Sequence, residues 1–329
     1  MRPAAGIAPY LVQRVIGGLV TLWGITVVTF LLSRLAPGGP ADAVLTEAFL
    51  AGERVDAAHA AEVEKVFGLD RPWPEQYVDW LGRSLRLDFG NSLADGESVR
   101  TKVGRAAGVS LVLQAVTLAV VFGLALPLGL WSALRRGSRR ERGVGGLLLL
   151  LYSIPSFVLA AALLWYFESL PAYGYESLDE GSRQGWAALT DRARHLFLPV
   201  CCLAAGGVVV VSRYTRSGML DALHQGFVRA ARARGLREHV VVLRHVVRNG
   251  LVPVVTLLGF AFPALLSGSV IVEQIFSIPG LGTAMFDAID RRDYPTVMAI
   301  STLTGVATLV GFLIADLAYL VLDPRIRLD

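Results

Sequence analysis

The stretch FVRAARARGLREHVVVLRHVVRNGLVP, residues 227–253, places six arginines and two histidines between two strongly apolar runs. Its first part predicts a short helix that ends at Gly235, because glycine suits the left-handed conformation at a helix C-terminus. In its second part Val240, Leu243 and Val247 fall on one helical stripe. The arginines fall on another stripe: Arg237, Arg244 and Arg248. We expect a helix, a glycine stop and a second helix that lies along the cytoplasmic membrane surface, apolar side inward. The alternative is a simple positively charged membrane anchor, which would need arginines but not two helices separated by a glycine.

The composition on either side of this stretch is that of a membrane protein. Hydrophobic residues make up 54% of the 329 positions and charged residues 18%, whereas charged residues are about a quarter of soluble globular chains. A hydrocarbon core about 30 Å thick is crossed by about 20 mostly apolar residues. Because lipid offers no hydrogen-bond partner to the backbone, such spans should be helices. The sequence therefore predicts an all-α polytopic fold with six spans: 10–33, 109–134, 143–167, 196–212, 250–272 and 294–322.

Three prolines fall inside these expected spans. Pro127, Pro155 and Pro263 each remove a backbone donor, so each is expected to kink its helix. Such kinks leave room for movement, but a static packed bundle also contains them. The sequence leaves both interpretations open.

Positive charge predicts the orientation of the spans. The connection after the second span reads RRGSRRER, and the connection after the fourth holds the arginines between 213 and 248. Lys and Arg resist translocation and stay on the cytoplasmic side. We therefore expect both termini and both basic connections to be cytoplasmic. Nucleic-acid binding is not favoured, because the membrane topology accounts for every basic stretch.

The segment between the first two spans is the only sizeable part with a soluble character. It is expected to be a small extracytoplasmic cap, because it opens with the breaker cluster APGGPA and contains more acidic than basic residues. Apolar residues at helical spacing predict two short amphipathic helices separated by DRPWP. The first contains Val63, Val66 and Phe67, and the second contains Tyr77, Trp80, Leu81 and Leu85. The segment is too short for a large core of its own, so it should lean on the membrane helices.

Motifs for chemistry within the chain are lacking. The two lysines, Lys65 and Lys102, do not stand in a Gly-Lys-Ser/Thr phosphate-binding loop, and there is no HExxH or GxSxG motif. Charges in the spans are few, and those present lie near span ends: Arg14, Glu273 and Asp316. A proton-driven secondary transporter would be expected to bury more carboxylates. An intramembrane enzyme would have to rely on hydroxyls such as Ser153 and Ser156, which are more typical of helix packing.

Five separated stretches resemble one known family. ARARGLREHVVVLRHVVRNGLVPVVT is similar to the cytoplasmic coupling loop of inner-membrane permease subunits of binding-protein-dependent ABC importers, in the dipeptide, oligopeptide and nickel class. The stretches YLVQRVIGGLVTLWGITVVTFLLSRLAPGGPA and GLDRPWPEQYVDWLGRSLRLDFGNSL resemble its first helix and external segment. VEQIFSIPGLGTAMFDAIDRRDYPTV and ADLAYLVLDPRIR resemble its later external loop and last helix exit. Where the family's loop has an acidic residue, this chain has Arg229.

The resemblance implies a division of labour between subunits. Two permease chains would form the pathway in the bacterial inner membrane, two ABC ATPases would dock from the cytoplasm, and an extracytoplasmic binding protein would deliver the ligand. ATP and Mg would then belong to the ATPases, and this chain would be no enzyme, with no catalytic, cofactor or metal site. The expected cargo is a peptide; nickel chelates or another small solute are the alternative within the family, and a self-sufficient secondary transporter is the alternative outside it.

The resemblance also assigns residues to two loops. Small residues of the coupling loop would allow close docking in an ATPase groove, and its arginines would meet acidic groups there. Its expected residues are Arg229, Ala230, Ala231, Arg232, Arg234, Gly235, Leu236, His245, Arg248, Asn249 and Pro253. The external loop SIPGLGTAMFDAIDRRDYP would form a gate or a docking surface for the binding protein, through Pro279, Gly280, Leu281, Gly282, Asp287 and Arg292.

These assignments divide the chain into three parts. The first, residues 1–35, is the cytoplasmic N-terminus with the first span. The second, residues 36–108, is the extracytoplasmic segment. The third, residues 109–329, is a five-helix permease core that contains the coupling loop at 213–250.

Overall fold

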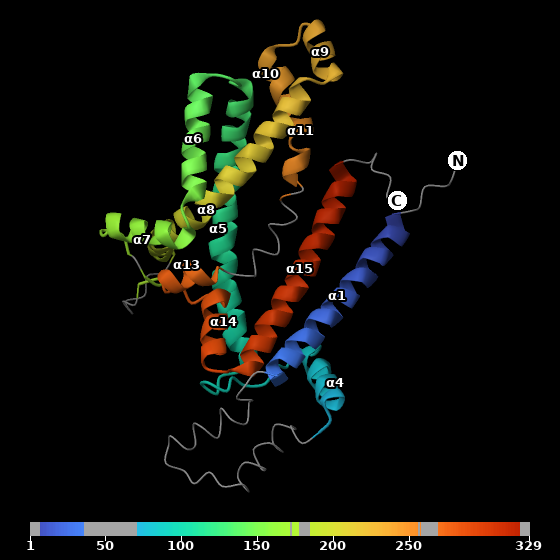
Figure 1. Ribbon diagram of the computed structural model, residues 1–329, viewed down its shortest axis with the longest axis vertical. Coiled ribbons are helices and arrows are strands. Elements are labelled where there is room, and N and C mark those ends of the chain that lie inside the picture. Colours follow the sequence, from blue (N-terminus) through green and yellow to red (C-terminus); the bar gives the residue numbers. More distant parts are fainter. Residues whose placement is uncertain are drawn as a thin grey trace. The chain divides into compact units, whose positions relative to one another are not determined.

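A computed structural model describes residues 7–35, 71–171, 173–177, 185–255, 257 and 269–322. Within these residues the chain is helical, and its β-structure is a single bridge between Asn91 and Ser98. Figure 1 shows the helices in chain order. Their bounds are α1 Ile7–Leu35, α4 Trp73–Ser84, α5 Val99–Leu134, α6 Arg139–Ser153, α7 Ser156–Tyr166, α8 Trp186–Leu223, α9 Gly226–Ala233, α10 Glu238–Val240, the π-helix η1 Val241–Val246, α11 Val247–Gly250, α13 Val270–Ile275, α14 Leu281–Asp290 and α15 Tyr294–Leu322.

Four of these helices, α1, α5, α8 and α15, are long and apolar enough to cross a membrane. They confirm helices at the first, second, fourth and sixth expected spans. Two of them are longer than expected: α5 has 36 residues and α8 has 38. The expected fifth span, 250–272, lies largely outside the described residues, as does its Pro263.

The third expected span is not one continuous helix. Residues 143–167 fall on α6 and α7, which meet at an angle of 99°. Pro155 causes the break, because it lacks a backbone donor and its ring disfavours helical geometry at the preceding residue. Ile154 is accordingly extended, with ψ 121°. At about 1.5 Å per residue, the 15 residues of α6 are shorter than the hydrocarbon core of about 30 Å.

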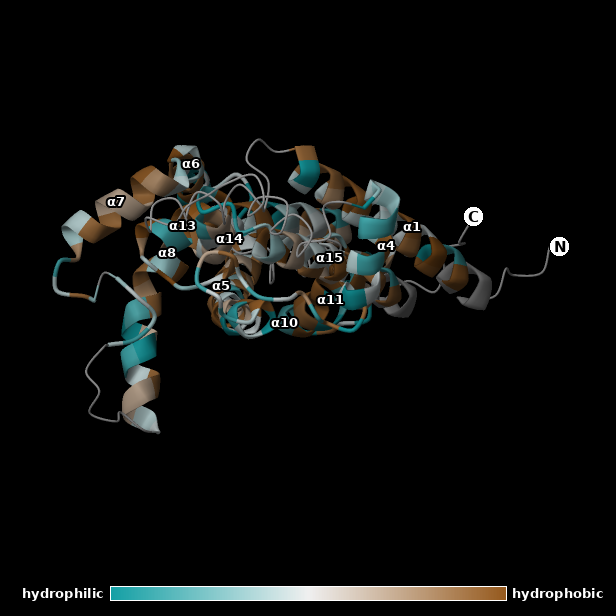
Figure 2. Ribbon diagram, turned by 90° about the horizontal axis from the view of Figure 1, so that it is seen from below, coloured by the Kyte–Doolittle hydropathy of each residue, from teal (hydrophilic) through white to brown (hydrophobic). Residues whose placement is uncertain are grey.

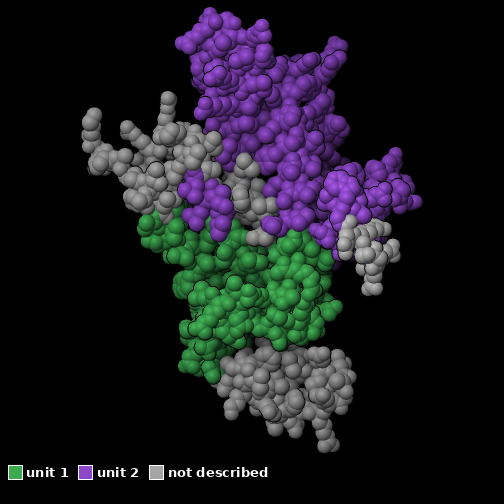
Figure 3. Space-filling model, turned by 180° about the vertical axis from the view of Figure 1, so that it is seen from behind, with its two compact units in different colours: residues 1–110, 279–309 green, residues 111–278, 310–329 purple. Residues whose placement is uncertain are grey.

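The molecule comprises two compact units, coloured separately in Figure 3. Unit 1 consists of residues 1–110 and 279–309, and unit 2 of residues 111–278 and 310–329. Figure 2 shows that the long helices are apolar over much of their length, whereas α4 is largely hydrophilic.

In unit 1 helix α4 packs on α1, as its amphipathic pattern predicts. The Tyr77 hydroxyl lies 2.9 Å from the Thr26 hydroxyl. The rings of Tyr77 and Trp80 lie 5.4 and 6.2 Å from the ring of Phe30. The amphipathic helix expected around Val63 and Phe67 lies outside the described residues.

In unit 2, backbone contacts between small residues hold α8 against two neighbouring helices. A Cβ atom added to Gly218 on α8 would overlap the Gly250 carbonyl oxygen on α11. A Cβ atom added to Gly129 on α5 would lie 2.6 Å from the Ser212 carbonyl oxygen on α8. Without side chains at these points, the helices approach to backbone contact. The direction of α8 therefore fixes where α11 and the preceding loop can lie.

We expect Gly218→Ala to lower the free energy of unfolding by about 1–3 kcal/mol, because the added methyl group forces α8 and α11 apart. Alanine's better helix propensity, about 1 kcal/mol, offsets only part of this. The matched control is Gly226→Ala at the start of α9, where the added Cβ meets open space. Thermal unfolding of the purified protein in detergent measures the stability of both variants. Equal unfolding midpoints would contradict the backbone contact between α8 and α11.

Candidate functional site

The expected glycine stop after the first loop helix is confirmed. Helix α9 ends at Ala233, and Gly235 follows with φ +75°, in the left-handed region. The Gly235 N–H donates to the Arg232 carbonyl at 2.9 Å, and the Leu236 N–H donates to the Ala231 carbonyl at 3.4 Å. This pair of bonds is the Schellman arrangement, which satisfies the last carbonyl groups of a helix. The chain then turns sharply into α10.

One face of α9 is buried within unit 2. Val228 is fully buried and Ala231 is 5% exposed, and both belong to a core cluster with Met219 of α8 and with Val241 and Val246 of η1. The docking role expected of Ala231 does not fit this burial, because its side chain faces the chain's own core. Ala230, the neighbouring small residue, is exposed.

The arginines on the exposed side of α9 differ in their partners. Arg232 donates two hydrogen bonds to Glu238, at 2.6 and 3.1 Å, across the glycine turn. These bonds raise the pKa of Arg232 and lower the pKa of Glu238. Arg229 and Arg234 are exposed and make no ion pair with the described residues. Arg232 therefore stabilises the turn, and Arg229 and Arg234 are left available for an acidic partner.

The second loop helix differs from the expected one. Residues 241–246 form a π-helix, whose bonds join residues five apart. This wider turn buries Val241, Val242 and Val246. Of the expected stripe, Val247 packs against the core cluster of unit 2 and Val240 is half-buried, whereas Leu243 is 64% exposed. Val241 and Val246 belong to this cluster, and both η1 and α11 contact α8.

The remaining residues expected in the coupling loop lie between Leu236 and Pro253. Leu236, Arg248 and Asn249 are exposed, and His245 is half-buried. The Asn249 amide donates to the His245 carbonyl at 2.7 Å. Pro253 is half-buried, and a Cβ added to Gly218 would lie 3.2 Å from its Cδ. Pro253 therefore supports the crossing with α8.

The two basic connections lie at the same end of unit 2. Glu141, in the first turn of α6, accepts hydrogen bonds from the Arg216 guanidinium of α8, with a shortest distance of 2.9 Å. Ser138 caps α6 by accepting from the Glu141 N–H at 3.1 Å. The connection of residues 135–142 is thus joined to the cytoplasm-facing end predicted for α8. Figure 1 shows the α5–α6 turn and α9 at this end.

The loop after residue 278, predicted to be external, combines a buried stretch with exposed positions on either side. Leu281 is 1% exposed, and its N–H donates to the Ser110 hydroxyl at 2.8 Å. Gly280 and Gly282 are also buried, whereas Pro279 is exposed. Asp287 and Arg292 are exposed, and Arg292 has φ +56° at the turn after α14. Of the residues expected here, Pro279, Asp287 and Arg292 therefore offer a surface to a partner.

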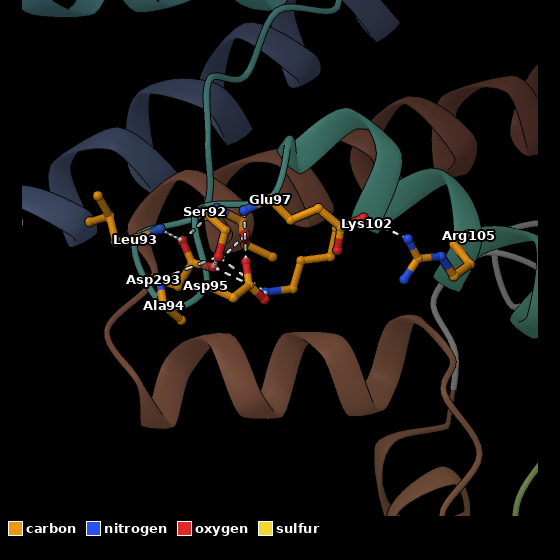
Figure 4. A network of polar contacts seen from close by, with 9 residues as sticks. Ser92, Leu93, Ala94, Asp95, Glu97, Lys102, Arg105 and Asp293 are labelled. Atoms are coloured by element: carbon orange, nitrogen blue, oxygen red, sulfur yellow. Dashed lines mark hydrogen bonds and ion pairs between the residues drawn. The ribbon is translucent and has the colours of Figure 1, made fainter.

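Next to this loop lies a buried cluster of polar contacts around Asp293, here called the clamp, which the sequence did not lead us to expect. Asp293 is fully buried and accepts hydrogen bonds from the Ser92 and Thr296 hydroxyls, both at 2.6 Å. It also accepts from the Leu93 N–H at 3.0 Å, and the Lys102 ammonium lies 3.6 Å away. Figure 4 shows Ser92, Leu93 and Lys102 around the Asp293 carboxylate. The clamp fixes the loop before α5 to the start of α15, within unit 1.

Lys102 also binds Asp95, at 2.7 Å. This hydrogen bond is the main reason that the pKa of Asp95 falls to about 2. Because the folded pKa is depressed, the contribution of this pair to stability is present above the ordinary Asp pKa of about 3.9. It is lost only as pH falls through about 2, so the pair is ionised throughout the physiological range.

One local signal could have located the clamp. The pattern Asp293-x-x-Thr296 directly before a long apolar run is typical of a helix N-terminus. The other half of the clamp could not be found this way, because Ser92 is 201 positions earlier in the chain.

The described residues contain no group of three or more His, Cys, Asp or Glu side chains able to hold a metal ion. The residues predicted to contact partner proteins fall on two exposed regions, one face of α9 and the loop around α14.

Two family models match the chain. The model of the binding-protein-dependent transport system inner membrane component matches residues 125–328, and the model of the N-terminal part of such membrane components matches residues 7–96. The oligopeptide transport system permease protein AppB of Bacillus subtilis is 34% identical over 97% of this chain and 99% of its own length. The di/tripeptide transport system permease protein DppB of Pseudomonas aeruginosa is 36% identical over 96% and 98%. A chain of the MetNI methionine ABC transporter, solved in inward-facing conformations, gives a TM-score of 0.49 at 16% identity, over 66% of this chain and 95% of that one.

We expect Asp293→Ala to lower the free energy of unfolding by about 3 kcal/mol, because it removes the buried partner of the Lys102 ammonium and four hydrogen bonds to the carboxylate. Thermal unfolding in detergent measures the loss. Asp290→Ala, at the exposed end of α14, is the control and should leave the midpoint unchanged. A midpoint for Asp293→Ala that equals the control would show that the clamp does not stabilise unit 1.

Proposed function

This chain belongs to the family of binding-protein-dependent transport system inner membrane components, and on that premise we propose that it forms half of the membrane pathway of a peptide ABC importer. It is a multi-pass inner-membrane permease subunit rather than a catalytic one. The peptide cargo is proposed from its relatives, which are named for oligopeptide and di/tripeptide transport and match over nearly their whole length.

The proposed assembly has four further subunits. A second, homologous permease chain completes the pathway, two ABC ATPases bind ATP and Mg on the cytoplasmic side, and an extracytoplasmic binding protein delivers the peptide. Lipid surrounds the helices. The absence of a phosphate-binding loop in the sequence supports placing ATP hydrolysis in separate subunits.

The proposed topology has six spans with both termini in the cytoplasm. The joining of the two basic connections through Glu141 and Arg216 supports it, because both connections must then lie on the same side, where Lys and Arg are retained. We keep the division into residues 1–35, an extracytoplasmic segment at 36–108 and a permease core at 109–329, with the coupling loop at 213–250.

Coupling to the ATPases is proposed to run through α9. The observation that carries this proposal is that α9 exposes Arg229, which has no ion-pair partner in the described part of the chain, while its other face is packed into the core beside α8. A short helix held in this way can enter a groove of a partner and pass on a displacement. The coupling requires that α9 contacts the ATPase differently in its open and closed states, since equal contacts shift no equilibrium.

The residues proposed to contact the ATPase are Arg229, Ala230, Arg234, Gly235 and Leu236, all of which are exposed. The residues proposed to hold the loop in shape are Ala231, Arg232, His245, Asn249 and Pro253. Arg248 is exposed on α11 and is proposed to lie at the cytoplasmic membrane surface.

On the external side, the loop around α14 is proposed as a gate or docking surface for the binding protein. Its exposed Asp287 and Arg292 provide charges for such a contact. The clamp at Asp293 would then connect this surface to the first turn of α15.

We expect Gly235→Val to preserve membrane insertion and assembly but to abolish the stimulation of ATP hydrolysis by the peptide-loaded binding protein. Valine is strained at φ +75°, because its branched side chain disfavours the left-handed region. Gly235→Asn, which tolerates this region better, should retain more stimulation. ATP hydrolysis of the complex reconstituted in nanodiscs is the measurement.

The control for this experiment is Gly82→Val on the external helix α4, where an added Cβ also meets open space. It should leave stimulation at the wild-type level. Intact stimulation in Gly235→Val would overturn the coupling role of α9. Failure of ATPase subunits to co-purify with the wild-type chain would overturn the proposed function itself.

A cysteine at position 287 should cross-link to the binding protein in the ATP-bound complex and not in the nucleotide-free complex, because docking is expected to tighten when the motor closes. Mass spectrometry of the cross-linked band identifies the partner. Arg136→Cys, exposed in the basic connection, should give no such product. Absence of the Asp287→Cys product in every nucleotide state would count against the docking surface.

A further inference from the structure

A polar cavity of about 750 Å³ lies in unit 1, between the end of α1, the helix α4 and the start of α15. Its volume is within the usual range for small-molecule sites. Three arginines and several aromatic rings line it, among them Arg34, Arg71, Arg83, Trp80, Phe89 and Tyr294. Asp79 is the one carboxylate among the described residues of its wall, and it is already paired with Arg71 at 3.0 Å. The cavity therefore has an excess of positive charge.

Arg34 is the least satisfied of these cations. Its Nε and Nη1 atoms are buried and have no hydrogen-bond partner in the described part of the chain. Its guanidinium lies 5.2 Å from the centre of the Phe30 ring, a cation–π contact that holds the group in place. Leaving a buried charged donor without an acceptor is unfavourable, so an oxyanion at this position would be stabilised. A guanidinium matches phosphate and carboxylate oxygens with two parallel hydrogen bonds.

An apolar groove of about 480 Å³ lies along the same helices. The cavity is lined by residues 30–34 of α1 and 294–298 of α15, whereas the groove is lined by residues 19–26 and 299–306 of these helices. At about 1.5 Å per residue, the groove is centred roughly 10–14 Å deeper along the helices. Phe89 lines both spaces. This distance is close to the depth of one leaflet of a hydrocarbon core about 30 Å thick.

A second cation stands at the groove. Arg100, in the first turn of α5, lines it and is exposed. The other lining residues are almost all apolar, including Leu22, Trp23, Leu85 and Leu303. The cavity with its surplus arginines and the apolar groove with Arg100 thus follow one another along α1 and α15. Together they have the dimensions and polarity of a phospholipid site.

We propose that unit 1 binds one anionic phospholipid, with its phosphodiester on Arg34 and an acyl chain in the groove between α1, α4, α5 and α15. Charge complementarity favours a headgroup that lacks an amine, such as that of phosphatidylglycerol, because the arginines of the cavity outnumber its carboxylate. With the topology proposed above, the site lies in the outer leaflet. The lipid would fill the space between α1, α4 and α15 and hold the start of α15 beside the clamp at Asp293.

Native mass spectrometry and thermal unfolding test the site on the purified complex in dodecyl maltoside, with added phosphatidylglycerol as the probe. The wild type should retain one phosphatidylglycerol more tightly than phosphatidylcholine and unfold at a higher temperature with it. Arg34→Gln should weaken retention on the order of tenfold or more, since it removes a charge-assisted bidentate contact. Arg34→Lys should lie between the two. The matched control Arg86→Gln, an exposed position outside the cavity, should behave as the wild type.

A second pair of variants tests the groove without touching the arginines. Gly104 lines the groove, and a Cβ added there meets open space. Gly104→Leu should therefore exclude the acyl chain and lose the lipid without an internal clash. Gly108→Leu, one turn further along α5, also meets open space and does not line the groove; it should retain the lipid.

Three results would overturn the proposal. The first is equal retention of phosphatidylglycerol and phosphatidylcholine. The second is unchanged retention in both Arg34→Gln and Gly104→Leu. The third is a rise in unfolding temperature with inorganic phosphate or with a peptide carboxylate that equals the rise with the lipid. That result would assign the cavity to a small anion. None of these results bears on ATPase coupling, which is measured separately.

Discussion

The contact on which the position of α9 to α11 depends is the crossing of α8 and α11 at Gly218 and Gly250. The two backbones touch there because neither residue has a side chain. Close packing of this kind transmits displacement, since protein interiors do not deform continuously. The buried face of α9 adds a second attachment through Val228. The exposed arginines of α9 therefore stand on a helix that is packed against α8 through the core of unit 2.

The clamp at Asp293 plays a similar part in unit 1. A fully buried carboxylate joins the loop before α5 to the first turn of α15 through two hydroxyls, one backbone N–H and the Lys102 ammonium. Buried charge of this kind does little for net stability compared with a well-packed apolar core, but it specifies which groups must meet. The end of the loop around α14 is in this way tied to the first turn of α15 and to the loop before α5.

Local chemistry allowed the sequence to predict much of this structure. The stop at Gly235 follows from its backbone freedom, and the break at Pro155 from its missing donor, although not the angle of 99° that splits the third span. The π-helix at 241–246 was unpredictable, because a valine-rich run fits α-helical spacing equally well. The contacts between Ser92 and Asp293 and between Gly218 and Gly250 were also out of reach, since only the folded chain brings these partners together.

The central claim is that α9 and α8 move as one body when the ATPases close. Spin labels at Ala230 on α9 and Arg213 on α8, both exposed, report this directly through their dipolar distance in the assembled complex. The account predicts the same distance distribution with and without ATP, while a label pair between Ala230 and the ATPase changes. A change in the distance between the labels at Ala230 and Arg213 on ATP binding would contradict this claim. In that case α9 would move relative to α8 and would not move it.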